Sequence, residues 1–240
     1  HDLILPVSST IAAALIPHPE FTSRVHVLFN SVSVPAEDPG DTGKLDELLR
    51  SYPEVRRWLL VVGKLSPRKN QAAAVQVLRS LMDAGETDTG LLLAGDVDPD
   101  YQPVMEQAIA AAGVGNRVAM IGNFDGVASL LQRADTLLLP SFREGLPRSL
   151  VEAVTAGKPA FSFPCEGVED IYGPHRSTFV SADSTAAALV STVRQAWSQP
   201  EASAKAFAEV RESVLARFSP QAHLARLSGL LNGPSRKPFR

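Results

Sequence analysis

The chain has 240 residues, of which 45% are hydrophobic and 20% are charged, and its formal net charge is −3. This composition is typical of a globular protein with an apolar core, and it excludes a largely disordered chain. The small negative charge argues against a general nucleic-acid binder. No apolar run reaches the roughly 20 residues of a membrane span.

The cysteine content bears on the cellular compartment, and the first residue bears on whether the chain is an excerpt. Cys165 is the only cysteine, so an intrachain disulfide is excluded and a reducing compartment fits. We therefore expect a cytoplasmic location. The chain begins with His1 and has no basic-then-apolar leader, and we interpret it as an excerpt from a longer protein.

The first third of the chain divides into two parts. Residues 1–34 suggest two short strands, at 2–9 and 24–30, which flank a helix-like stretch at 10–16. Residues 35–56 begin with a run rich in Pro, Gly, Asp and Glu, which is typical of a surface linker. We expect residues 1–34 to be a remnant of a preceding domain and 35–56 to be a linker.

Residues 57–220 alternate between apolar runs and helical patterns. The runs predict strands at 58–63, 89–95, 117–122, 135–140 and 159–163, and the helical patterns lie at 69–84, 100–112, 125–133 and 146–156. Continuous apolar strands separated by helices predict an α/β fold with a doubly wound parallel sheet, Rossmann-like, covered on both faces. In such folds ligands bind beyond the carboxyl ends of the strands.

Helices follow the last predicted strand. Alanine-rich patterns predict them at 183–198, 200–217 and 220–231, and prolines at 200 and 220 separate them. We place the end of the α/β domain at residue 220. Residues 221–240 are then a C-terminal helix and a basic tail.

A glutamate lies in an otherwise apolar helix. Glu152 is surrounded by Leu150, Val151, Ala153 and Val154, so its charge needs a partner. A pair of vicinal hydroxyls, as in a ribose, is one such partner, because each hydroxyl donates a charge-assisted hydrogen bond. A nearby Arg or Lys is the alternative, and spacing alone does not decide between them.

A second carboxylate lies just before the same helix. Gly145 allows a tight turn, and Pro147 suits the first helical turn, so the helix is predicted to begin near residue 146 with Glu144 at its mouth. The free N–H groups there favour an anion. That anion is either Glu144 itself, acting as a cap, or a phosphate, with Glu144 turned toward a neighbouring sugar.

Two lysines flank the turn after the first strand of the sheet. Lys64 and Lys69 bracket it, and Lys69 lies with Arg68 at the start of a helix, where the macrodipole disfavours cations. An anion between the helix and these side chains resolves the conflict. A solvated basic turn is the alternative.

Together these features resemble the nucleotide-sugar-binding half of a GT-B-fold glycosyltransferase of the large retaining group (family 4, or group 1). The most specific element is the pair Glu144 and Glu152, with seven residues between them and followed by AGKP. The other matching stretches are GKLSPRKN (63–70), LLLAGD (91–96), VAMIG (118–122), the run from 134 to 161 and GVED (167–170). The turn PCEGVED replaces the family's more common Gly-Gly turn, and Lys64 stands where the family usually has Arg.

The resemblance implies a role for each matching position. Lys69 and Lys64 would neutralise the donor diphosphate, Glu152 would hold the ribose hydroxyls, and Glu144 would face the transferred sugar. Backbone N–H groups at the helix mouth would contact sugar and phosphate, and residues after the third strand would lie near the base. The implied catalytic residues are Lys69, Glu144 and Lys64. The implied donor site is Gly63, Lys64, Lys69, Asn123, Phe124, Glu144, Gly145, Leu146, Pro147, Arg148 and Glu152.

The resemblance also implies reaction and partners. A UDP-, GDP- or ADP-sugar would be the substrate, with no cofactor and no metal, and the acceptor would be a glycan, a lipid-linked or a small-molecule hydroxyl. The acceptor side would come from a missing N-terminal domain in cis or from a partner chain. Peripheral membrane association is common in such enzymes.

Other functions remain as alternatives. They are a non-catalytic nucleotide-sugar-binding module or subunit, a sugar-nucleotide epimerase of the same fold and, more remotely, a nicotinamide-dependent enzyme. The sequence DVDPD (96–100) imitates a calcium loop but lacks its glycine and its final glutamate, so we predict no metal site.

Overall fold

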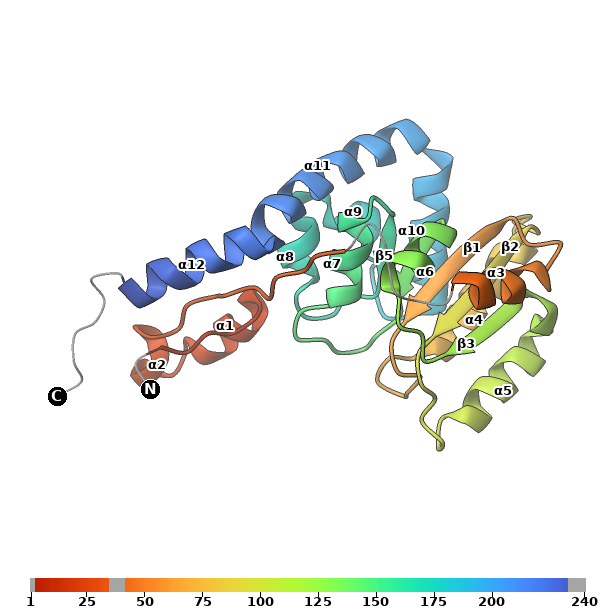
Figure 1. Cartoon of the computed structure of the whole chain (residues 1–240), viewed down its shortest axis with the longest axis horizontal. Helices are drawn as coiled ribbons and strands as arrows, with labels where there is room; N and C mark the ends of the chain where they lie inside the picture. The colour runs from red at the N-terminus through yellow and green to blue at the C-terminus, as the bar shows by residue number, and fades with distance from the viewer. Residues whose placement is uncertain (1–2, 35–41, 233–240) are drawn as a thin grey trace.

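The centre of the computed structural model, which describes residues 3–34 and 42–232, is a five-stranded parallel sheet in the order β3-β2-β1-β4-β5 (Figure 1). The strands are β1 (Arg57–Val62), β2 (Thr89–Ala94), β3 (Val118–Gly122), β4 (Thr136–Leu139) and β5 (Ala160–Ser162). All the described pairings between them are parallel. The predicted α/β class and the five predicted strands are confirmed.

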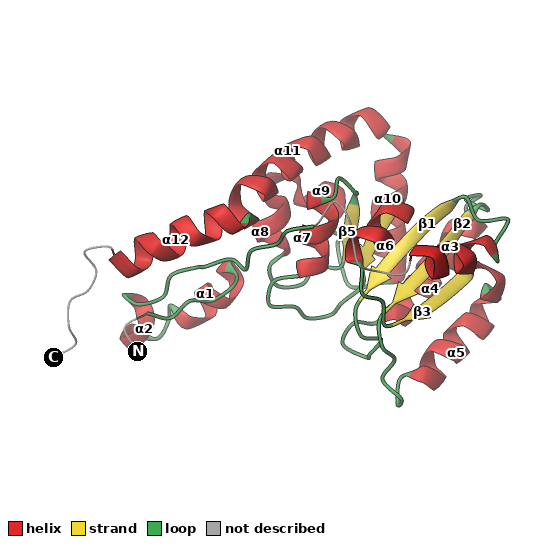
Figure 2. Cartoon of the chain, in the orientation of Figure 1, coloured by secondary structure: helices red, strands yellow, loops and turns green. Residues whose placement is uncertain are grey.

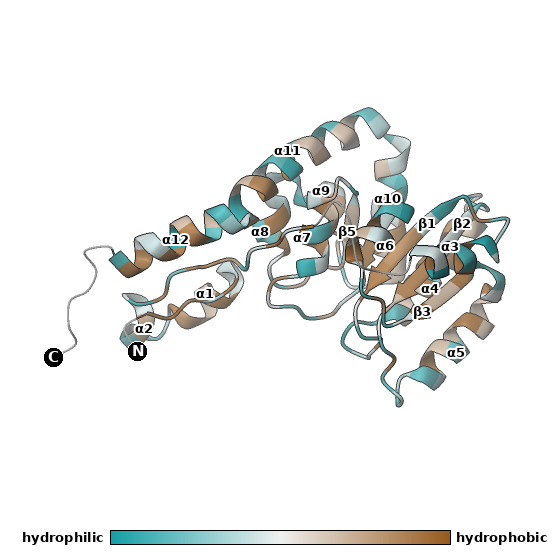
Figure 3. Ribbon diagram, viewed as in Figure 1, coloured by the Kyte–Doolittle hydropathy of each residue, from teal (hydrophilic) through white to brown (hydrophobic). Residues whose placement is uncertain are grey.

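Burial explains why the strands read as unbroken apolar runs. Every residue of β2 and of β4 is buried, as are the four central residues of β1. The strands are the most apolar part of the domain in Figure 3, and helices pack on both faces of the sheet (Figure 2). A strand covered on both faces has no solvent side, so alternation between polar and apolar residues disappears.

The helices within the sheet region connect successive strands, except that the last two follow β5. They are α4 (Gln71–Asp83), α5 (Gln102–Ala112), α6 (Val127–Arg133), α7 (Arg148–Thr155), α8 (Val168–Tyr172) and α9 (Arg176–Phe179), with short 3₁₀ turns at Gly115–Arg117 and Gly173–His175. The helices α8 and α9 were not predicted. They are too short for a helical period to show in the sequence.

The C-terminal helices agree with the prediction. They are α10 (Ala186–Ser198), α11 (Pro200–Phe218) and α12 (Pro220–Asn232). The basic tail lies outside the described residues. Across 3–34 and 42–232, no helix combines the length and apolarity needed to cross a membrane.

The N-terminal segment differs from its prediction. Its helices are α1 (Ser9–Leu15) and α2 (Pro19–Thr22), but the two expected strands reduce to one isolated parallel bridge, between Ile4 and Val25. The pairing includes hydrogen bonds from the amides of His26 to Ile4 and of Leu28 to Pro6, and Pro6 has no N–H with which to continue the ladder. The segment runs beside α12 (Figure 1), and the ring Nδ1 of His223 lies 2.7 Å from the carbonyl oxygen of Phe29.

A helix occupies part of the predicted linker. Residues 42–50 form α3 (Thr42–Arg50), while 35–41 lie outside the described residues. Leu45 of α3 is fully buried in the core. The guanidinium of Arg133 on α6 donates to both carboxylate oxygens of Asp46, at 2.7 and 2.9 Å. The polar composition of residues 35–56 did not predict this helix, which contributes one buried leucine to the core of the domain. The domain boundaries themselves stay predictions.

The Asp46–Arg133 pair gives a test of how firmly α3 is attached. The pKa of Asp46 is lowered, first by its hydrogen bond with Arg133. We expect Asp46→Asn to lower the free energy of unfolding at pH 7 by about 0.5 kcal/mol, since the pair is partly exposed. A lowered folded pKa means that this contribution exists above the unfolded pKa of about 3.9 and is lost as pH falls through the folded value.

Chemical denaturation at pH 7 and pH 2.5 measures that difference. Glu47→Gln, on an exposed position of the same helix, is the matched control. An equal loss in the control, or a loss that persists at pH 2.5, would contradict the assignment to this ion pair.

Candidate functional site

The candidate site lies where the sheet order reverses. From β1 the chain crosses to β2 and β3 on one side, while β4 and β5 lie on the other, so the neighbours β1 and β4 form the switch point. The carboxyl ends of such neighbouring strands leave a crevice in which ligands bind. The loop after β1 (63–70, the β1 loop) and the loop after β4 (140–147, the β4 loop) flank this crevice. The amide of Phe142 donates to the carbonyl of Arg68 at 3.0 Å and joins them.

Glycine is required where the β1 loop begins. A Cβ on Gly95, which follows β2, would lie 2.3 Å from the carbonyl oxygen of Gly63, and both glycines have positive φ, +144° and +129°. Real Cβ atoms do not approach this closely, and L side chains rarely adopt such φ values. The backbones leaving β1 and β2 therefore run in contact, which brings the β1 loop over the sheet.

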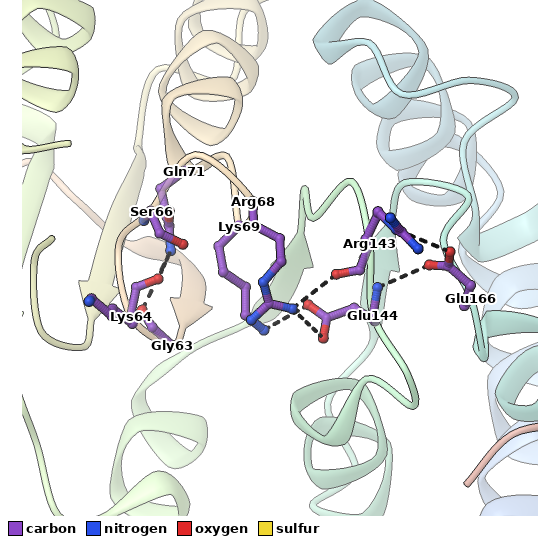
Figure 4. A network of polar contacts seen from close by, with 9 residues as sticks. All are labelled: Gly63, Lys64, Ser66, Arg68, Lys69, Gln71, Arg143, Glu144 and Glu166. Carbon is purple, nitrogen blue, oxygen red and sulfur yellow. Dashed lines mark hydrogen bonds and ion pairs between the residues drawn. The ribbon is translucent and has the colours of Figure 1, made fainter. Parts of the chain in front are cut away.

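Lys69 and Glu144 form an ion pair across the crevice (Figure 4). Their Nζ and Oε1 atoms are 2.7 Å apart, and the side chains are only 18% and 9% exposed. The guanidinium of Arg68 lies 3.8 Å from the other carboxylate oxygen. Glu144 thus supplies an anion beside these cations at the start of α4.

Neither α4 nor α7 is capped by the side chain of its own N-cap residue, although the hydroxyl of Tyr101 accepts from the amide of Ala72 in the first turn of α4 at 3.2 Å. The N-cap of α4 is Asn70, in the left-handed region with φ +52°, and the N-cap of α7 is Pro147; neither provides a side-chain hydrogen bond. The prediction that Pro147 lies in the first helical turn is therefore off by one residue, since α7 begins at Arg148. The carboxylate of Glu144 pairs with Lys69 across the crevice, and among the described contacts it makes no hydrogen bond to an amide of α7, so it does not cap that helix. Its role toward a sugar stays a prediction.

Gln71 holds the shape of the β1 loop. Its side chain is fully buried, accepts from the amide of Ser66 at 3.1 Å and donates to the carbonyl of Lys64 at 3.1 Å. Sequence reasoning missed this residue, although a glutamine at the start of an apolar helix was a visible signal. Burying its amide is compensated only if these backbone partners stay in place.

Lys64 lies apart from the pair. Its Nζ is 3.3 Å from Asp98, its side chain is 60% exposed, and it points away from Lys69 and Glu144 in Figure 4. The structure therefore does not bring Lys64 to the same point as Lys69. It holds Lys64 at the rim, beside the loop after β2.

Glu152 is a desolvated carboxylate on α7. Its side chain is 16% exposed, and burial raises its pKa, while Arg148 one turn earlier lowers it by a smaller amount. Arg148 lies 3.6 Å away and is itself 62% exposed, and within the described part of the chain it is the ionic partner of Glu152. The alternative of a nearby arginine is thus realised, but beyond hydrogen-bonding distance.

The remaining predicted residues lie at the rims of the crevice. Gly145, Leu146 and Pro147 continue the β4 loop, and a Cβ on Gly145 would lie 3.5 Å from Ile11 of α1. Asn123 is exposed and Phe124 is half-buried against the core, after the edge strand β3. Among the described contacts, no hydrogen bond or ion pair links these two to the Lys69–Glu144 pair.

A third loop, after β5, also joins the network and was missed from sequence. The carboxylate of Glu166 accepts from the amide of Glu144 at 3.1 Å and lies 3.6 Å from Arg143 (Figure 4). Burial, with the charges of Glu144 and Glu166, raises the pKa of the neighbouring Cys165 to about 12. That thiol is therefore protonated at neutral pH and is no nucleophile. The departure of PCEGVED from the Gly-Gly turn was the available signal.

The described residues offer no group of three or more His, Cys, Asp or Glu side chains that could hold a metal ion. The described site is built from two carboxylates, one half-buried lysine and the N-terminus of α7, whose N-cap residue provides no side-chain hydrogen bond. These are groups that bind hydroxyls and phosphate oxygens.

Comparison with known proteins identifies the family. Residues 51–212 match the family described as glycosyl transferases group 1. A 2-deoxystreptamine glucosyltransferase from Streptomyces kanamyceticus is 32% identical over 152 residues, which are 62% of this chain and 38% of that protein.

Solved structures show the same fold. A glycosyltransferase from Rickettsia africae ESF-5 has a TM-score of 0.81 at 18% identity, over 97% of this chain and 64% of that one. Anabaena HepE, in complex with UDP and glucose, has a TM-score of 0.79 at 19% identity, over 96% and 63%. The fold is thus the C-terminal half of a GT-B fold. The chain belongs to the group 1 glycosyl transferases, and it spans about two fifths of the curated relative's length.

Proposed function

We propose that this chain is the donor-binding half of a retaining glycosyltransferase that moves a sugar from a nucleoside diphosphate to an acceptor hydroxyl. The observation that carries the proposal is the Lys69–Glu144 pair at the β1–β4 switch point, together with the desolvated Glu152 on the helix that follows the β4 loop. A cation among free helix N–H groups suits a diphosphate, and a carboxylate short of hydrogen bonds suits a diol.

The donor lies across the strand ends in this proposal. Lys69 shares its ammonium between Glu144 and the diphosphate, and Lys64 approaches from the rim. Glu152 accepts hydrogen bonds from the ribose hydroxyls, Glu144 faces the transferred sugar, and Asn123 and Phe124 lie toward the base. Backbone groups of Gly63, Gly145, Leu146 and Arg148, with Pro147 shaping the turn, complete the contacts.

The chemistry follows from where charge develops. As the bond between the sugar and the diphosphate breaks, negative charge grows on the leaving group and positive charge grows on the sugar ring. Preorganised cations and N–H groups stabilise the first, which is electrostatic catalysis. Glu144 stabilises the second. The acceptor hydroxyl attacks the face that the leaving group vacates and passes its proton to an oxygen of the departing diphosphate, so configuration is retained. The proposal requires no metal ion.

A second half completes the enzyme in this proposal. The acceptor site lies on an N-terminal domain in cis or on a partner chain, and this chain alone binds donor but transfers slowly or not at all. UDP is the first nucleotide to test, because HepE was solved with UDP and glucose. An acceptor with free hydroxyls, such as the 2-deoxystreptamine in the name of the Streptomyces relative, is the matching acceptor class.

Calorimetric titration with UDP, GDP, ADP and NAD tests the proposal. Selective binding of one nucleoside diphosphate, with NAD ineffective, is the expected result. Comparable binding of NAD would favour a nicotinamide enzyme. Turnover of UDP-N-acetylglucosamine without acceptor would favour an epimerase. If a chain shown to be folded binds none of these nucleotides, the assigned residue roles are contradicted, whereas the fold is not.

A further inference from the structure

One peptide bond at the mouth of the crevice is held on both sides by side chains. It joins Arg143 to Glu144. Its carbonyl oxygen accepts from the guanidinium of Arg68 at 3.2 Å, and its N–H donates to Glu166 at 3.1 Å. Figure 4 shows Arg68 reaching it from the β1 loop and Glu166 from the loop after β5. Two loops distant in sequence therefore fix the plane of a single peptide.

The plane of this peptide sets the direction of the Glu144 side chain. Rotation of the peptide would turn the Cα–Cβ bond of Glu144 and move its carboxylate off Lys69, which it contacts at 2.7 Å. Glu166 also pairs with the side chain of Arg143, because its second carboxylate oxygen lies 3.6 Å from that guanidinium. The side chain of Glu166 is 30% exposed, so it is anchored but not part of the core.

The charge of Glu166 strengthens this anchor. A hydrogen bond from an amide to an ionised carboxylate is shorter and stronger than one to a neutral oxygen. The pKa of Glu166 is lowered, first by backbone hydrogen bonds and also by Arg143, so the group is ionised at neutral pH. Among the described contacts, Glu166 is the acceptor for the amide of Glu144.

We propose that Glu166 is a positioning residue: by holding the Arg143–Glu144 peptide, it keeps the Glu144 carboxylate aimed at the transferred sugar of the donor. This inference rests on the proposed function, because it takes Glu144 as the group that faces the sugar. It predicts that Glu166 affects recognition of the sugar and leaves recognition of the nucleotide unchanged.

Measuring the binding of UDP and of UDP-glucose to the full chain separates recognition of the nucleotide from recognition of the sugar. Glu166→Ala is expected to weaken UDP-glucose binding about fivefold, the usual effect of losing one hydrogen bond, while UDP binding changes less than about twofold. Glu166→Gln retains an acceptor oxygen for the amide and should restore UDP-glucose binding to within about twofold of the unmodified chain. A merely structural role would weaken both ligands together.

Glu169→Ala is the matched control. Glu169 lies three residues further on and pairs with Arg176, and it makes no contact with the Arg143–Glu144 peptide. Its substitution should change neither ligand. Hydrogen exchange at the amide of Glu144, followed by NMR without ligand, should accelerate in Glu166→Ala and not in Glu169→Ala.

Each other outcome counts against the inference. Unchanged UDP-glucose binding in Glu166→Ala overturns it, as does an equal loss for UDP and UDP-glucose, or an unchanged exchange rate at Glu144. If the unmodified chain prefers another nucleoside diphosphate, that nucleotide and its sugar derivative replace UDP and UDP-glucose in these measurements. If it binds no nucleoside diphosphate, the donor site itself is wrong and the inference falls with it. That result is distinguishable, because it appears before any substitution is made.

Discussion

Replacement of Lys69 by alanine is expected to weaken binding of the preferred nucleoside diphosphate by roughly thirtyfold, about 2 kcal/mol. Two effects add. The ammonium that faces the diphosphate is lost, and the carboxylate of Glu144, which is 9% exposed, loses the partner that lies 2.7 Å away. Arg68, at 3.8 Å and 60% exposed, compensates only in part. An under-neutralised carboxylate then repels the incoming phosphates.

Calorimetry on the full chain measures this effect. Lys205→Ala removes the same charge from an exposed position on α11 and is the matched control for net charge. The double variant Lys69→Ala/Glu144→Gln should recover part of the lost UDP affinity, because it removes the unpaired charge. If Lys69→Ala binds the nucleotide as tightly as the control does, Lys69 does not contact the diphosphate.

Substitution of Glu152 by glutamine is expected to weaken nucleoside-diphosphate binding about tenfold, or 1.4 kcal/mol, while it stabilises the unliganded chain. The carboxylate is 16% exposed and lies 3.6 Å from its ionic partner Arg148. An ionised acceptor holds two ribose hydroxyls better than a neutral amide does. The same charge is a cost to the fold until those hydroxyls arrive.

The sign of the stability effect follows from the pKa. Burial raises the pKa of Glu152 in the folded chain above its unfolded value, which is near 4.3. At a pH between these two values, the native state binds more protons than the unfolded state does. Stability therefore falls as pH rises through this window. At pH 7 we expect Glu152→Gln to raise the free energy of unfolding by about 1 kcal/mol, and this gain should vanish below pH 4.

Denaturation at pH 4 and pH 7, with titration of the preferred nucleotide at pH 7, checks both parts. Glu212→Gln, at an exposed position of α11, controls for the loss of one negative charge. A variant that gains stability without losing affinity would show that Glu152 is strained for some reason other than ligand binding. A variant that loses stability at pH 7 would show that the Arg148 pair outweighs desolvation.

The sequence by itself determined the class of fold and the location of the crevice. The strands β1, β2 and β4 are almost entirely buried, and burial on both faces makes them unbroken apolar runs that can be recognised without a structure. Loops beyond their carboxyl ends then mark the ligand-binding edge. The buried charge of Glu152 was also visible, because a carboxylate within an apolar helix stands out against its neighbours.

Which residues of the site come into contact with one another could be learned only from the tertiary structure. Lys69 and Glu144 are 75 residues apart in sequence and meet because β4 adds beside β1, an order that local patterns do not encode. The same strand order brings Glu166 to the Glu144 amide and leaves Lys64 at the rim. Helix α3 was hidden for a related reason, since its single buried leucine and its ion pair with Arg133 require the sheet to be folded first. Local patterns fix elements, whereas contacts between loops depend on which strands become neighbours.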